Sequence, residues 1–202
     1  NFDDAPQQIK ITEQDVDEFE RAPAESKVEM CHRMVNVLSG EPDPGLVRRV
    51  LVQMLDVKQL PVGVAQRFSR QADQVPADLC PLYLGVLSQY VRSLKDVQLR
   101  KLIQTASDHL DSPYATVFLV RFFNEGPVEH QVKLRVARKL CKQTIYYSEF
   151  TQKHRISQLV QVFKNITNSE ESQYLQQQIA TNFVHELAVH QQQLRLFKAP
   201  QL

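Results

Sequence analysis

Apolar residues recur along most of this chain at intervals of three or four, which is the spacing of one face of an α-helix. Residues 113–124 are apolar on nearly every side, with Arg121 as the only charge, so a helix here must be covered on several sides. Residues 127–144 have two faces. The apolar face carries Val132, Val136, Ala137, Leu140 and Cys141, and the opposite face carries Arg135, Arg138, Lys139 and Lys142. We therefore predict a central helix followed by an amphipathic helix with a basic outer side.

Prolines mark where many of the predicted helices begin. A proline in the first helical turn loses no hydrogen bond and fixes φ near its helical value. By this rule, helices begin near Pro44, Pro61, Pro76, Pro113 and Pro127. Pro81 lies five residues into its segment, so either the helix begins there or it is kinked.

Other helices are predicted from caps and apolar periodicity alone. Thr12 to Asp15 has the form of a capping box with Asp in place of Glu, and the helix that it begins ends near Arg21. Further helices are predicted over 24–39, 96–109 and 148–163, and the longest from 168 or 169 to about 194. Gly40 ends the first of these. The chain thus predicts about ten helices joined by short links.

This succession predicts an all-α protein. Short links make neighbouring helices antiparallel, and a helical pair recurs roughly every 35–40 residues. In helix number and spacing, most of the chain resembles HEAT- and armadillo-like helical-repeat domains. The resemblance implies antiparallel hairpins in a right-handed superhelical array of about ten helices. A compact, non-repeating helical domain is the alternative, and it would also explain the all-round apolar helix at 113–124.

Acidic residues gather near the N-terminus. Residues 1–29 hold nine acidic and three basic side chains, a net charge of −6, and the remaining residues carry +7. We predict that residues 1–22 form an acidic lead-in with a short helix packed on the core, and that residues 23–202 form a single all-helical domain. Asp15, Asp17 and Glu18, the acidic entry helix, are predicted to bind a partner; alternatively, this segment lies across the basic body.

Composition indicates a soluble globular protein, with 43% hydrophobic and 23% charged residues. No apolar run approaches 18 residues, so no transmembrane helix and no membrane partner are predicted. No secretory signal is visible either. Cys31, Cys80 and Cys141 are isolated within apolar helical patterns. They predict buried thiols and a reducing intracellular compartment, the nucleus or the cytoplasm.

The sequence contains no motif for catalysis, cofactor binding or metal binding. With 5 glycines, it is too poor in glycine for a phosphate-binding loop. His185 and His190 (HELAVH) invite comparison with the HExxH zinc motif, but a spacing of five places them about 140° apart around a helix. We therefore predict no enzyme, no cofactor, no metal and no small-molecule substrate.

The main candidate for a functional site is a basic stripe between Gln131 and Arg155, where the sequence has seven lysines and arginines and a single acidic residue, Glu149. Its members are Lys133, Arg135, Arg138, Lys139, Lys142, Lys153 and Arg155. Such a stripe contacts an acidic protein or phosphates, although the solvated outer face of an amphipathic helix also explains it. Tyr146 and Tyr147 can hold a base or a peptide, or simply pack at a helix junction.

These observations predict a non-enzymatic scaffold domain for protein–protein interaction, a subunit or fragment of a larger intracellular complex. Its partners would be other protein subunits, bound through the basic stripe and the acidic entry helix. The alternative is binding of RNA or DNA through the stripe of residues 133–155. Because the chain begins with Asn1 rather than Met, we expect it to be part of a longer protein.

Overall fold

The computed structural model describes residues 10–144 and 146–166, and within these ranges the chain is helical and contains no strand. The prediction of an all-α protein is confirmed. The α-helices are α1 (Glu13–Arg21), α2 (Ala24–Met34), α3 (Pro44–Leu55), α4 (Val62–Ser69), α5 (Cys80–Leu87), α6 (Asp96–Asp108), α7 (Pro113–Glu125), α8 (His130–Thr144) and α9 (Glu149–Lys164). The 3₁₀ helices are η1 (Val35–Leu38), η2 (Ala72–Gln74), η3 (Ala77–Leu79) and η4 (Ser88–Ser93). The predicted helix from 168 or 169 to about 194, with His185 and His190, lies outside the described residues.

Side-chain caps begin several helices where the sequence predicted. The backbone N–H of Thr12 donates to the Asp15 carboxylate (2.8 Å) and that of Asp15 to the Thr12 hydroxyl (3.2 Å), which completes the predicted capping box of α1. Asp43 Oδ1 accepts from the N–H of Gly45 (2.9 Å) before α3. Ser112 Oγ accepts from the backbone N–H of Tyr114 (3.2 Å) at the start of α7. Each bond satisfies an N–H group that has no partner within its helix.

The segment that begins at Pro76 is divided rather than continuous. A 3₁₀ turn, η3, comes first, and Pro81 lies in the first turn of α5, so this helix begins at the proline instead of bending around it. Beyond α5, the backbone of Tyr90 leaves helical geometry (φ −118°, ψ 16°). Its hydroxyl accepts from the N–H of Leu60 (3.0 Å) and donates to the carbonyl of Val57 (2.9 Å). These bonds hold η4 against the link between α3 and α4, a constraint that helical periodicity does not contain.

Two other boundaries also differ from the prediction. The segment 24–39 is an α-helix only to Met34 and continues as η1, and Gly40 follows with a φ of 70° that favours glycine. The helix predicted from Pro127 begins at His130. Before it, the N–H of Gly126 donates to the carbonyl of Phe122 (2.8 Å), and a Cβ on Gly126 would lie only 2.5 Å from that oxygen. This close turn ends α7 and precedes the start of α8.

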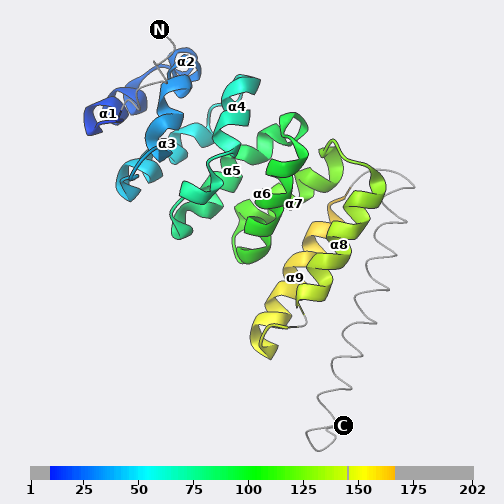
Figure 1. The fold of residues 1–202 in the computed structure, drawn as a ribbon. Coiled ribbons are helices and arrows are strands. Elements are labelled where there is room, and N and C mark those ends of the chain that lie inside the picture. Colours follow the sequence, from blue (N-terminus) through cyan, green and yellow to red (C-terminus); the bar gives the residue numbers. More distant parts are fainter. Residues whose placement is uncertain (1–9, 145, 167–202) are drawn as a thin grey trace, which may run out of the picture.

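The helices follow one another across the molecule in chain order, from α1 and α2 at one end to α8 and α9 at the other (Figure 1). Helix α7 packs against α5, η4, α6 and α9, so the prediction that it is covered on several sides is confirmed. It buries Ala115, Phe118, Leu119, Phe122 and Phe123. It also leaves an exposed strip of Tyr114, Val117 and Arg121, which its nearly uniform apolar sequence did not predict.

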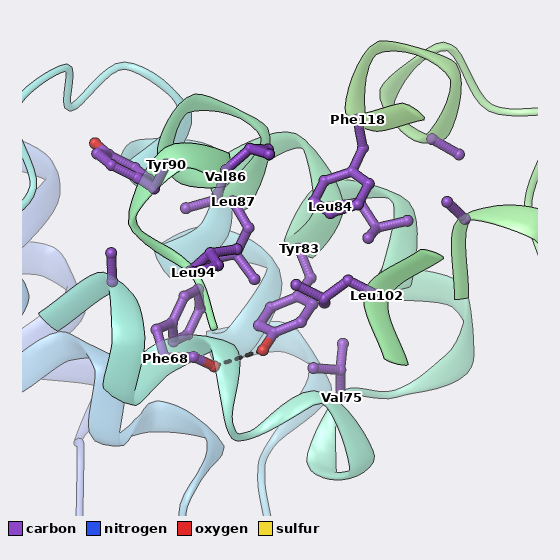
Figure 2. Close-up of a cluster of buried hydrophobic side chains, with 14 of the residues drawn as sticks. Phe68, Val75, Tyr83, Leu84, Val86, Leu87, Tyr90, Leu94, Leu102 and Phe118 are labelled. Carbon is purple, nitrogen blue, oxygen red and sulfur yellow. Dashed lines mark hydrogen bonds between the residues drawn. The ribbon is translucent and has the colours of Figure 1, made fainter. Parts of the chain in front are cut away.

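One apolar core extends through the described residues, from Ile11 to Ile166. Figure 2 shows the part where the rings of Phe68 and Tyr83 meet, with their centroids 4.9 Å apart, and where the Tyr83 hydroxyl donates to the Phe68 carbonyl. Val16 and Phe19 of α1 are fully buried in the same core, so the first helix packs on the rest of the molecule. None of the described helices has both the length and the apolar character needed to cross a lipid bilayer.

Candidate functional site

Asp15, in the acidic entry helix, is engaged by groups of its own chain. Its carboxylate lies 3.1 Å from Arg33 Nη2 of α2 and accepts hydrogen bonds from the backbone N–H and the hydroxyl of Thr12. The bond from the Thr12 N–H, with help from the hydroxyl and the nearby Arg33 charge, lowers the pKa of Asp15. Asp15 thus caps α1 and joins it to α2.

Arg49 of α3 gathers further acidic side chains of α1. Its Nη2 atom lies 2.5 Å from carboxylate oxygens of both Asp17 and Glu20, and its Nη1 atom lies 3.8 Å from Glu13 Oε1. The hydrogen bond from Arg49 lowers the pKa of Glu20. Glu18, the third predicted member of the acidic entry helix, is exposed and forms no ion pair with any described residue. Asp15 and Asp17 therefore pair with basic side chains of α2 and α3, whereas Glu18 remains exposed.

Four members of the basic stripe share the outer side of α8. Arg135, Arg138, Lys139 and Lys142, which we call the basic face, are all exposed, and their positions span an arc of about 100° on the helix. None of them forms an ion pair with a carboxylate of the described residues. Neighbours three and four apart are therefore like charges, an arrangement that destabilises an isolated helix by about 0.2–0.5 kcal/mol per pair.

Arg155 does not belong to the exposed stripe, and this part of the prediction is wrong. Only 4% of its surface is exposed. Its guanidinium donates to the Ser107 carbonyl (2.6 Å), the Ser107 hydroxyl (3.2 Å) and the Thr144 hydroxyl (3.4 Å), and it lies 4.1 Å from the centre of the Tyr147 ring. Arg155 therefore joins α6, α8 and α9, because an arginine can be buried when its N–H groups find acceptors.

The other two members of the stripe also lie apart from the basic face. Lys133 is half-buried, and its number places it on the opposite side of α8 from Arg135. Lys153 is exposed but belongs to α9. The structure therefore brings together four of the seven predicted stripe residues.

A groove of about 250 Å³ lies beside the basic face, between α6 and α8. Its apolar lining consists of Ile103 from α6 and Val132, Val136 and Leu140 from α8. Its polar lining consists of Arg100, Gln104 and Ser107 from α6 and Arg135, Lys139 and Gln143 from α8. The Ser107 hydroxyl donates to Gln143 Oε1 (3.3 Å), which connects the two helices at one end of the groove. Arg135 and Lys139 belong to both the groove and the basic face, whereas Arg138 and Lys142 do not line the groove.

Aromatic side chains are exposed at the turn between α8 and α9. Tyr146 and Phe150 are 75% and 86% exposed, while Tyr147 stacks on the Arg155 guanidinium. The predicted packing at a helix junction thus holds for Tyr147 but not for Tyr146. Lys142 and Lys153 flank this turn in the sequence.

The described residues hold no group of three or more His, Cys, Asp or Glu side chains arranged to bind a metal ion. Cys31 and Cys141 are buried, and burial raises the pKa of each thiol to about 12. Both thiols are therefore protonated and poor nucleophiles at neutral pH. Cys80 is only partly buried, so the prediction of buried thiols holds for two of the three cysteines.

The α6 side of the groove is the part of the site that sequence reasoning missed. The periodicity of residues 96–109 predicted a helix whose apolar residues are Val97, Leu99, Leu102, Ile103, Ala106 and Leu110, and of these Val97 is exposed in the structure. It did not indicate that α6 lies beside α8, because α7 separates them in the chain. Val132 and Val136 lie on the apolar side of α8 but are only partly buried in the structure. Their partial exposure depends on the position of α6, which the sequence did not predict.

Comparisons with protein-family models, curated proteins and solved structures gave no match for this chain. The proposal for its function accordingly depends on the geometry and the charges of the basic face and the groove.

Proposed function

We propose that this chain is a non-enzymatic protein–protein interaction domain, a scaffold within a larger intracellular complex in the cytoplasm or nucleus. The observation that carries this proposal is the basic face, whose four charges have no counter-charge among the described residues and lie beside an apolar groove. Mutually repelling charges lower the stability of α8, and an acidic protein surface would remove that repulsion. The chain-order succession of helices supports an extended, HEAT-like right-handed superhelical array as the scaffold's form (Figure 1).

The test compares the parent chain with two charge-matched variants in affinity capture from cell extract treated with nuclease. The first variant reverses the basic face with Arg135→Glu, Arg138→Glu, Lys139→Glu and Lys142→Glu. The second makes an equal change in net charge at exposed residues elsewhere, with Lys10→Glu, Lys58→Glu, Arg70→Glu and Lys95→Glu. We expect nuclease-resistant protein partners that the first variant loses and the second retains. Equal capture by all three proteins would contradict the proposal.

Nucleic-acid binding is the second candidate function. The observation that favours it is the exposure of Tyr146 and Phe150 between Lys142 and Lys153, because bases stack on aromatic rings while basic side chains contact phosphates. Binding of single-stranded RNA or DNA should then weaken steeply with added salt. Tyr146→Ala with Phe150→Ala should weaken it further. No binding of either nucleic acid at low salt would remove this candidate.

A further inference from the structure

The groove between α6 and α8 combines an apolar floor with a basic rim. We call the buried and half-buried apolar residues of the lining its floor, and the exposed basic residues its rim. The floor consists of Ile103, Val132, Val136 and Leu140, and the rim of Arg100, Arg135 and Lys139. None of the described residues that line the groove is acidic. A surface that offers apolar contact along its centre and positive charge at its edges is complementary to a segment with the reverse chemistry.

We propose that this groove binds an amphipathic helix of a partner protein, with apolar residues on one side and Asp or Glu flanking them. This inference rests on the proposed function and names the chemistry of the partner segment. The bound segment lies along α6 and α8, with its apolar side on the floor and its carboxylates beside the rim.

The spacing of the floor residues indicates a helix as the occupant. Val132, Val136 and Leu140 recur every four residues on α8 and therefore form a single ridge along the helix. From the first to the last, this ridge rises about 12 Å, which is a little more than two helical turns. A helix that presents apolar residues at i, i+3, i+4 and i+7 offers a matching stripe of that length.

The charges around the groove indicate that the occupant is acidic. Arg135 and Lys139 form no ion pair with a described carboxylate. Arg100 lies 3.0 Å from Asp96 Oδ2, but both side chains are more than half exposed, so this pair does little to neutralise the rim. Arg138 and Lys142 extend the positive charge beyond the groove and would attract the same partner without contacting it.

The test is a selection from a display library of random 16-residue peptides with the full chain as bait. Enriched peptides are then synthesised with a fluorophore, and their affinities are measured by fluorescence anisotropy. We expect enriched sequences to carry Leu, Ile or Phe at helical spacing and an excess of Asp and Glu. Arg135→Glu with Lys139→Glu should weaken their binding roughly tenfold or more, because both charges border the groove. Val132→Gln should weaken it roughly tenfold, because the apolar contact is lost while the charge is kept.

The matched control is Arg138→Glu with Lys142→Glu, which makes the same change of charge on the same helix outside the groove. This control should retain most of the affinity. An equal loss of peptide affinity in both double variants would contradict binding in the groove and would leave only a basic protein-binding surface. A library that enriches no acidic amphipathic peptide would also contradict the proposal. Competition by single-stranded RNA but not by such peptides would overturn it too. So would a photo-crosslinker at Gln104 that reacts only with residues 167–202 of its own chain.

Discussion

Most acidic side chains of α1 are paired with opposite charges, whereas the side chains of the basic face on α8 are not paired with any described residue. Around α1, Asp15 pairs with Arg33, and Asp17 and Glu20 both contact Arg49, so acidic and basic side chains of neighbouring helices neutralise each other. On α8, the side chains of the basic face are neighbours of one another, and no carboxylate of the described residues pairs with them. The first region uses charge to join helices, and the second presents charge to the surroundings. Net charge along the sequence cannot distinguish these uses, because it does not say which side chains meet.

The largest predicted effect concerns Arg155, which follows the basic face in the sequence but, like the paired arginines near α1, binds groups of its own chain. Arg155→Met should lower the free energy of unfolding by about 2–4 kcal/mol, because the Ser107 carbonyl and the Thr144 hydroxyl lose a charged donor in a buried place. Chemical denaturation measures this directly. Lys153→Met, on the same helix but exposed, is the control and should change stability by less than about 0.5 kcal/mol. A similar small effect from Arg155→Met would mean that Arg155 behaves as a surface charge.

A smaller, pH-dependent effect is predicted for Arg49. Because Arg49 holds the pKa of Glu20 below its ordinary value of 4.5, this contact stabilises the protein above that pH and is lost as the pH falls through the lowered pKa. Arg49→Gln should therefore be less stable than the parent at pH 7, and the difference should shrink towards pH 3. Denaturation midpoints across this pH range test the prediction, with Arg70→Gln as the exposed control. A difference that stays constant with pH would show that Arg49 acts through packing instead.

The smallest predicted effect on stability comes from neutralising the basic face. A variant with Gln at all four positions (Arg135, Arg138, Lys139 and Lys142) should be more stable than the parent by at most about 1 kcal/mol in the free energy of unfolding. The gain is expected because like-charge pairs along α8 are removed. The gain should vanish in high salt, where these charges are already screened. Thermal unfolding at low and high salt measures both values. A clear loss of stability would mean that the basic face is engaged within the protein, as the charges around α1 are.

The sequence indicated local features well because local chemistry decides them. The capping box at Thr12 and Asp15, the helix starts at Pro44 and Pro113, and the stop at Gly40 each depend on neighbouring residues. Predictions failed where a distant contact intervened. Tyr90 leaves helical geometry where its hydroxyl binds Val57 and Leu60, 33 and 30 positions earlier in the chain, and no local pattern contains that contact.

The sequence predicted the basic face of the candidate site but not its groove, because the groove depends on contacts between distant segments. The spacing of Arg135, Arg138, Lys139 and Lys142 on one side of a helix follows from 3.6 residues per turn, so the basic face was predictable. Whether a basic residue remains at the surface depends on acceptors brought by other helices. Arg155, in a similar basic and aromatic context, is buried by Ser107, 48 positions earlier in the chain.

By itself, the sequence determined the all-helical class, most helix starts, the apolar sides and the four charges of the basic face, because these follow from backbone periodicity and from caps within a few residues. Only the tertiary structure decided that α6 lies beside α8 to form a groove, that Asp15, Asp17 and Glu20 of α1 pair with arginines of α2 and α3, and that Arg155 is buried between α6, α8 and α9. The physical reason is that burial and ion pairing are properties of pairs of surfaces. Those surfaces meet only when segments far apart in the chain pack on a shared apolar core.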